Sequence, residues 1–154
     1  MSVTDLLRAC PLFYELYEKE IEKIVSHCQV IPFEVGEKII KDGDEGNEIY
    51  VVLDGQAVVQ KKTATGIIKI QPLNPGDVFG EMVLIDQKLR TADIVAEKFS
   101  YILEIKYEDI FSLYKKEPKI FGLMILNLAR LISQRLKASN DIIVNLKNKI
   151  PKAA

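Results

Sequence analysis

Residues 79–96, FGEMVLIDQKLRTADIVA, place Glu81 directly after Gly80 and Arg90 nine residues further on, among mostly apolar neighbours. Gly80 can take the backbone conformations of a sharp corner, and EMVLI can form one helical turn after it. The first N–H groups of such a turn have no partner within the helix, and the positive end of the helix dipole lies beside them, so the turn favours an anion. The guanidinium of Arg90 can hold two phosphate oxygens in a fork, with the hydroxyl of Thr91 beside it. The stretch therefore predicts a phosphate site.

The carboxylate of Glu81 does not suit a phosphate, but an acidic side chain can accept a hydrogen bond from a ribose hydroxyl. One carboxylate for a hydroxyl and one arginine for a phosphate together describe a nucleotide. The alternative is a buried ion pair between Glu81 and Arg90 that joins two strands. Such pairs stabilise a fold only weakly once desolvation is counted.

The chain ahead of this stretch is rich in short β-branched segments that turn residues separate. Seven of the eight glycines lie between Gly36 and Gly80, where corners between antiparallel strands need them. Many short strands at regular spacing are typical of a sandwich or a barrel and not of a parallel sheet. The segments that we expect to form strands are EKIIK 37–41, EIYVVL 48–53, QAVVQ 56–60, GIIKI 66–70, ADIVAE 92–97 and SYILEIK 100–106.

Both ends of the chain show helical patterns. Apolar side chains in residues 17–28 recur at spacings of three and four, and residues 119–148 contain no proline and a single glycine. The length suits one domain. We expect this domain to span 1–154, with N-terminal helices in 1–28, strands in 29–106 and C-terminal helices in 107–150.

The long C-terminal helix carries two interleaved seven-residue repeats. They predict either a seam shared with a second copy, as in a coiled coil, or a helix docked on its own body. The only polar residue among them is Ser139. The repeats are Ile125, Ile132, Ser139 and Leu146, and Ala129, Leu136, Ile143 and Ile150.

The quoted stretch resembles the phosphate-binding cassette of the cyclic nucleotide-binding domain family. Phe-Gly-Glu at 79–81 and Arg-Thr-Ala at 90–92 stand at the family's spacing, and PLFYEL, FEVGEKIIKDGDEGNEIYVVLDGQAVV and LNPGDVFGE follow the family's order. The resemblance covers roughly residues 10–140. It implies a mainly β fold with flanking helices, an eight-stranded antiparallel jelly-roll β-barrel, and a cassette at 79–92.

The same resemblance implies roles for single residues. Glu81 would accept the ribose 2′-hydroxyl, Arg90 would bind the cyclic phosphate, and the hydroxyl of Thr91 would contact phosphate or base. Backbone N–H groups of the cassette would complete the phosphate seat. The residues expected to bind the ligand are Gly80, Glu81, Met82, Val83, Arg90, Thr91 and Ala92.

Two positions depart from the family's pattern. Val83 stands where a small residue is usual, and Leu89 stands where proline is frequent. Neither change removes a hydrogen-bond donor. We expect Val83 to crowd the phosphate and to keep the affinity modest.

The base is expected between the strands and the long helix, which would form its lid. By likeness to bacterial catabolite-activator proteins, RLKASND falls where the helix meets adenine, although Ser139 equally fits as a small residue tolerated in the seam. In eukaryotic relatives a Thr after the arginine can favour guanine, but hydroxyl residues at this position also occur in cAMP binders. We expect cAMP, with cGMP as the alternative. The residues expected at the base are Val59, Ile70, Ser139 and Asn140.

The composition limits the other classes of function. The chain is 48% hydrophobic and 28% charged, which predicts a packed core. A single histidine, His27, excludes most metalloenzymes and most Ser-His or Cys-His nucleophiles, so we expect no enzyme, no metal and no cofactor apart from the nucleotide ligand. Two cysteines without metal spacing, and no long apolar run, predict a cytoplasmic protein without a membrane contact.

Charge is divided unevenly along the chain. Residues 1–118 hold 14 basic and 21 acidic residues, a balance of −7, whereas residues 119–154 hold seven basic residues and one acidic residue, a balance of +6. The basic end is either a solvated helix flank or a weak contact for nucleic acid. Only PKAA follows Ile150, so we expect no module for specific DNA binding.

The expected function is therefore a cyclic nucleotide sensor whose ligand moves the C-terminal helix. Its expected partners are the nucleotide, a second copy that pairs through this helix, and a downstream protein. The alternative is a domain of the same fold that binds no nucleotide and acts as a dimerising or docking module.

Overall fold

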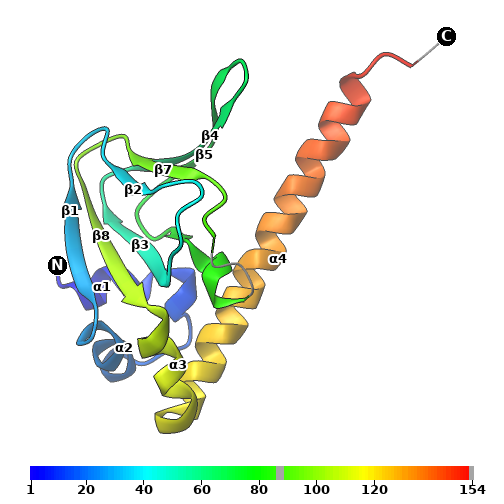
Figure 1. Ribbon diagram of the computed structural model, residues 1–154. Helices are drawn as coiled ribbons and strands as arrows, with labels where there is room; N and C mark the ends of the chain where they lie inside the picture. Colours follow the sequence, from blue (N-terminus) through cyan, green and yellow to red (C-terminus); the bar gives the residue numbers. More distant parts are fainter. Residues whose placement is uncertain (86–88, 153–154) are drawn as a thin grey trace.

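Eight strands form two antiparallel sheets of four strands each, and helices cover the outer face of one sheet (Figure 1). This computed structural model describes residues 1–85 and 89–152. The first sheet has the order β1-β8-β3-β6 and the second has the order β2-β7-β4-β5. The strands are β1 (Gln29–Phe33), β2 (Lys38–Ile40), β3 (Glu48–Asp54), β4 (Ala57–Thr63), β5 (Gly66–Leu73), β6 (Val78–Phe79), β7 (Asp93–Ala96) and β8 (Ser100–Lys106).

Helices precede and follow the strands, as the sequence predicts. A short 3-10 turn also interrupts the strands between β6 and β7, directly after Gly80. The helices are α1 (Val3–Arg8), α2 (Glu18–Val25), α3 (Tyr107–Lys116) and α4 (Pro118–Lys149), and the 3-10 turns are η1 (Pro11–Phe13) and η2 (Glu81–Leu84).

All six segments expected to be strands contain one, but two further strands were missed. β1 contains Pro32, which lowers the strand signal, and the structure places it at the edge of its sheet, where proline is tolerated. β6 has only two residues, too few to show a pattern.

The closed barrel that we expected is not found among the described strands. Their number and antiparallel pairing agree with the prediction, but hydrogen bonding divides them into two sheets. The strands that would bridge the sheets are short: β2 has three residues and β6 has two. Strands this short leave the hydrogen-bonded pairing interrupted between the two sheets.

The core has two parts, one on each face of the first sheet. In β3 the alternating residues Ile49, Val51 and Leu53 pack against the helices, whereas Tyr50 and Val52 pack against the second sheet. β3 is therefore buried on both faces and reads as a continuous apolar run. Each fully buried side chain of this size stabilises the fold by about 2 kcal/mol.

The two cysteines are free thiols. Cys10 lies in the core between the first sheet and the helices, and burial raises its pKa to about 11. Cys28 is half-buried, and burial raises its pKa to about 12. Both thiols therefore stay protonated near neutral pH and act as small apolar side chains.

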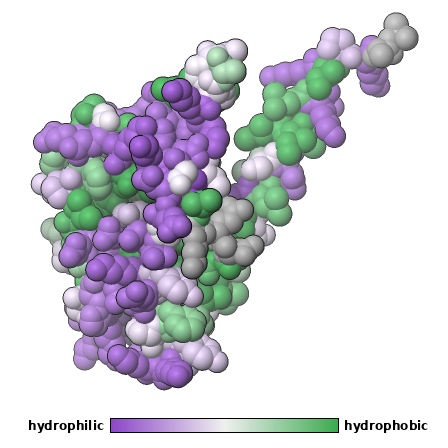
Figure 2. Space-filling model, viewed as in Figure 1, coloured by the Kyte–Doolittle hydropathy of each residue, from purple (hydrophilic) through white to green (hydrophobic). Residues whose placement is uncertain are grey.

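Helix α4 has 32 residues, and its two halves differ in surroundings. The first half buries Ile120, Met124 and Leu128 against the body, and the amide of Asn127 donates to the carbonyls of η1 and the residue after it. The second half projects beyond the body (Figure 1). Hydrophobic residues gather on the projecting part (Figure 2). The first half is therefore docked on its own body, whereas the seam shared with a second copy stays a prediction for the second half.

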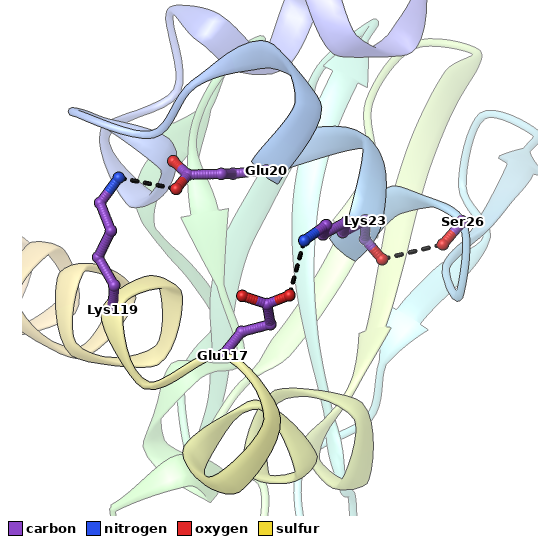
Figure 3. A network of polar contacts seen from close by, with 5 residues as sticks. All are labelled: Glu20, Lys23, Ser26, Glu117 and Lys119. Carbon is purple, nitrogen blue, oxygen red and sulfur yellow. Dashed lines mark hydrogen bonds and ion pairs between the residues drawn. The ribbon is translucent and has the colours of Figure 1, made fainter.

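Two ion pairs connect α2 to the corner between α3 and α4 (Figure 3). Lys23 Nζ lies 2.6 Å from Glu117 Oε1, and Lys119 Nζ lies 2.7 Å from Glu20 Oε1. Glu117 has backbone angles outside the helical region (φ −140°, ψ 67°), and Pro118 begins α4 directly after it. The corner is thus a bend held from outside by α2.

Among the described residues, none of the helices has both the length and the hydropathy of a membrane span.

Candidate functional site

A cavity of about 340 Å³ lies between the second sheet, η2 and α4. Its volume falls in the range of small-molecule sites. Nearly all residues that the sequence singled out lie around it, together with others that it did not. The lining residues are Ile40, Val59, Ile70, Gln71, Leu73, Phe79, Gly80, Glu81, Met82, Val83, Leu89, Arg90, Thr91, Ala92, Ile94, Arg135, Ala138, Ser139 and Ile142.

Gly80 forms the corner that leads into the cavity wall. Its φ of 76° lies in the left-handed region, which favours glycine. The expected helical turn follows as η2, and Met82 and Val83 in this turn line the cavity. The start of a helical turn, whose first N–H groups lack a helical partner, therefore lies in the cavity wall.

Arg90 is buried, with 8% of its surface exposed. Its backbone pairs with the loop after β2: Arg90 N–H donates to Asp44 O at 2.8 Å, and Gly43 N–H donates to Arg90 O at 2.9 Å. Strand β7 begins at Asp93, three residues after Arg90. The loop after β2 holds the backbone of Arg90 through these two hydrogen bonds.

The guanidinium of Arg90 has several partners. Its Nη1 donates to Gly80 O at 3.0 Å, and its Nη2 donates to Glu48 O at 2.7 Å and lies 3.5 Å from Glu48 Oε2. The centre of the Tyr50 ring lies 5.8 Å from the guanidinium carbon, and this ring stacks on Phe79. Burial, with the nearby carboxylates of Glu48 and Glu104, raises the pKa of Tyr50 to about 12, so its phenol stays neutral.

Glu81 is also buried, with 9% of its surface exposed. Its carboxylate accepts a hydrogen bond from Arg135 of α4, and the same guanidinium donates to the carbonyl of Val78. Within the described part of the chain, Glu81 and Arg90 each pair with another residue, so the strand-joining pair between them is not formed. The two opposite charges belong to one cavity without neutralising each other.

Arg135 was missed at the sequence level. It stands four residues before Ser139, on the same face of the helix, and this spacing was the signal that could have found it. Its contact with Glu81 spans 54 positions in the chain, which no local pattern reveals. Glu48 was missed for the same reason.

Thr91 and Ala92 lie at the cavity wall beside Arg90. Lys61 of β4 holds this segment, because its Nζ donates to Thr91 O at 2.7 Å and pairs with Asp42 Oδ2 at 2.7 Å. Thr91 itself is exposed, which leaves its hydroxyl accessible from the opening of the cavity.

Three of the four residues expected at the base line the cavity. Val59, Ile70 and Ser139 line the cavity, whereas Asn140 lies outside the set of lining residues that the structure describes. Consecutive side chains of a helix are rotated by about 100° about its axis, so Asn140 lies away from the wall that Ser139 lines. Gln71 of β5 lines the cavity and adds an amide that the sequence did not single out.

The charged residues that line the cavity are Arg90, Arg135 and Glu81, and Glu48, which is not part of this lining, contacts Arg90. Elsewhere the walls are mostly apolar. No group of three or more His, Cys, Asp and Glu side chains within residues 1–85 and 89–152 could hold a metal ion. The arrangement suits a ligand with one anionic group, a hydroxyl and a flat apolar part.

Comparison with known proteins gives the same picture. Residues 30–117 match the family described as cyclic nucleotide-binding domain. The "Cyclic AMP receptor protein" of Thermus thermophilus is 30% identical over 135 residues, which cover 87% of this chain and 61% of that protein. The "cAMP-dependent protein kinase regulatory subunit" of Schizosaccharomyces pombe is 33% identical over 97 residues, which cover 63% of this chain and 23% of that protein.

Solved structures share the fold. A cyclic nucleotide-binding domain from Methylobacillus flagellatus superposes with a TM-score of 0.83 at 23% identity, covering 99% of this chain and 85% of that one. The chain spans less than two thirds of the length of the two relatives above. The match over residues 30–117 covers more than half of the sequence, and the chain therefore belongs to the cyclic nucleotide-binding domain family.

Proposed function

We propose that this chain is a cyclic nucleotide sensor without catalytic activity, and that its ligand is cAMP before cGMP. The observation that carries the proposal is the convergence of buried Arg90 and buried Glu81 on one cavity together with η2 and α4. Two relatives whose printed names refer to cyclic AMP share this domain. A cytoplasmic location is part of the proposal, since two free cysteines suit a reducing compartment.

In this proposal each end of the cavity binds one part of the ligand. Arg90 holds the cyclic phosphate together with N–H groups of Met82, Val83 and Ala92, and Glu81 accepts the ribose 2′-hydroxyl. The base lies between Val59 and Ile70 on the strands and Ser139 on α4. The cavity is apolar where the base would lie and charged where the phosphate and ribose would lie, which supports this orientation.

The proposal also explains how the ligand would move α4. Arg135 joins α4 to the carboxylate of Glu81, so a ribose hydroxyl that reaches Glu81 must share it with this helix. A ligand shifts an equilibrium only through contacts that differ between the two states. The shared carboxylate is such a contact.

A second copy is the partner proposed for α4. The residues Leu136 and Ile143 of the seven-residue repeat are 61% and 49% exposed. They lie roughly a quarter turn around the helix from Arg135 and Ile142, which face the cavity. The helix therefore has one apolar face for its own body and another that a parallel copy would cover. We also propose a downstream protein as a partner, without assigning it a surface on this chain.

Calorimetric titration with cAMP and cGMP tests the ligand assignment. We expect wild-type protein to bind, and Arg90→Ala to lose about 2–5 kcal/mol of binding free energy, or at least about thirtyfold in affinity. Arg8→Ala is the matched control, because Arg8 is exposed on α1 far from the cavity. Equal affinity of wild type and Arg90→Ala would remove Arg90 from the site, and no binding by wild type would favour the docking module.

A further inference from the structure

The guanidinium of Arg90 already has hydrogen-bond partners within the protein. Of its five N–H groups, one donates to Gly80 O and another to Glu48 O. The carboxylate of Glu48 lies 3.5 Å from the same nitrogen, Nη2. A phosphate that binds Arg90 must therefore use the remaining donors, next to a carboxylate that is already present.

Two glycines and an aromatic ring lie close to the guanidinium of Arg90. A Cβ atom added at Gly46 would overlap the guanidinium, and one added at Gly80 would lie 2.8 Å from Nη1. The ring of Tyr50 lies beside the same group. The side chain is only 7% exposed, so we expect the ligand to approach Arg90 where it lies.

Glu48 is held by a strand pairing of its backbone and by a hydrogen bond to its carboxylate. It begins β3, where it pairs with Lys106 of β8, and its Oε2 accepts a hydrogen bond from Asn47 N–H at 3.0 Å. Its side chain is 32% exposed, so water screens its charge only in part. Its negative charge therefore acts both on Arg90 and on any anion that Arg90 binds.

We propose that Glu48 sets the affinity of the site, because its carboxylate competes with the phosphate of the ligand for Arg90. This inference rests on the proposed function, since it needs a ligand with an anionic group at Arg90. Two negative charges beside one guanidinium repel each other, and the cost falls on the bound state alone. The site thereby binds its ligand less tightly than Arg90 by itself would allow.

The substitution Glu48→Gln tests this directly. Glutamine keeps the length of the side chain, its acceptor oxygen and the backbone carbonyl that holds Arg90, but removes the charge. We expect calorimetry with cAMP to show binding about threefold to tenfold tighter than wild type in dilute salt. Glu108→Gln is the matched control, since Glu108 is an exposed glutamate on α3 outside the cavity lining and the same charge is removed there.

Salt separates competition between charges from a change of shape. Raising the salt from about 0.05 M to about 0.5 M shortens the range of electrostatic interactions, so the difference between Glu48→Gln and wild type should shrink. A difference that does not depend on salt would indicate altered packing and would overturn the proposal. So would unchanged or weaker binding by Glu48→Gln while wild type binds and Arg90→Ala does not. Absence of binding by wild type and by Glu48→Gln would overturn the proposed function itself.

Discussion

Arg90 lies between two glycines, and neither position leaves space for a larger side chain. Gly46 precedes β3 and Gly80 precedes η2, so two segments far apart in the sequence contact the same guanidinium. The space for the arginine is as important to the site as its charge. Gly80 also needs its left-handed backbone, whereas at Gly46 the only demand is room.

Gly46→Ala should therefore weaken ligand binding without unfolding the protein. The added methyl group displaces the guanidinium, and overpacking of this kind costs about 1–3 kcal/mol. We expect the affinity for cAMP, measured by calorimetry, to fall about tenfold or more. The circular dichroism spectrum should be unchanged.

Gly122→Ala is the control for this change. Gly122 lies in α4 with no atom within 4 Å of an added Cβ, so the substitution tests helix propensity alone. It should stabilise the helix by about 1 kcal/mol and leave binding as it is. If Gly46→Ala binds as tightly as wild type, the space around Arg90 has no role.

Site residues that lie close together in the sequence were predicted, whereas residues that reach the site from distant parts of the chain were missed. Glu81, Arg90 and the η2 turn belong to one local stretch, so spacing and residue type were sufficient to place them. Arg135 meets Glu81 across 54 positions and Glu48 meets Arg90 across 42. Such contacts follow from the packing of α4 and β3, which a local pattern does not contain. Whether Val83 crowds a phosphate stays a prediction.

Among the elements, α4 is the one that connects the cavity with the rest of the surface. It contributes Arg135, Ala138, Ser139 and Ile142 to the cavity wall. Arg135 contacts both Glu81 and Val78, the first residue of β6. This single side chain is the polar link between the projecting half of the helix and the cassette.

Arg135→Ala should separate ligand binding from the response of α4. We expect hydrogen exchange of amides in the second half of α4 to change when cAMP binds to wild type, because Arg135 must adjust to the ribose. In Arg135→Ala this change should be lost, while calorimetry still detects binding.

Lys137→Ala is the control, since Lys137 is an exposed charge on the same helix. Its α4 should respond to cAMP as in wild type. A full response of α4 in Arg135→Ala would show that the coupling runs through other contacts.

The elements themselves were predicted to different degrees for clear physical reasons. Strands such as β3 and β8 have long β-branched runs, and α4 has an unbroken helical pattern, so their existence followed from the sequence. The missed β1 contains Pro32, and β6 is too short to carry a period. The division into two sheets depends on hydrogen bonds between distant strands and could not be read from any single segment.

At the scale of the whole molecule, the projecting half of α4 presents an exposed apolar surface. Several of its large apolar side chains are at least half exposed, among them Ile142, Val144 and Leu146 (Figure 2). Exposed apolar patches on soluble proteins commonly mark a contact with a partner. A parallel copy would cover the seam formed by the two seven-residue repeats, in which Ser139 also belongs to the cavity wall.

Ile143→Asp should turn the proposed dimer into a monomer. A charge in the seam would be buried without a partner, which strongly disfavours the paired state. Sedimentation velocity should show a dimer for wild type and a monomer for this variant.

Val144→Asp is the control one residue further, where the side chain is rotated by about 100° from the seam. It should remain a dimer. A monomeric wild type, or an equal effect of both substitutions, would contradict the seam.

The bend at Glu117 and Pro118 has a mechanical consequence. Because α2 holds this bend through Lys23 and Glu20, the bend can serve as a fulcrum and α4 as a rigid arm. An α-helix of 32 residues is about 48 Å long, so a swing of about 5° at the bend displaces the far end by roughly 4 Å. Arg135, the residue of α4 that contacts η2, lies 17 residues from Pro118, or about 26 Å along the helix, so the swing that moves the far end by roughly 4 Å moves this contact by about 2 Å.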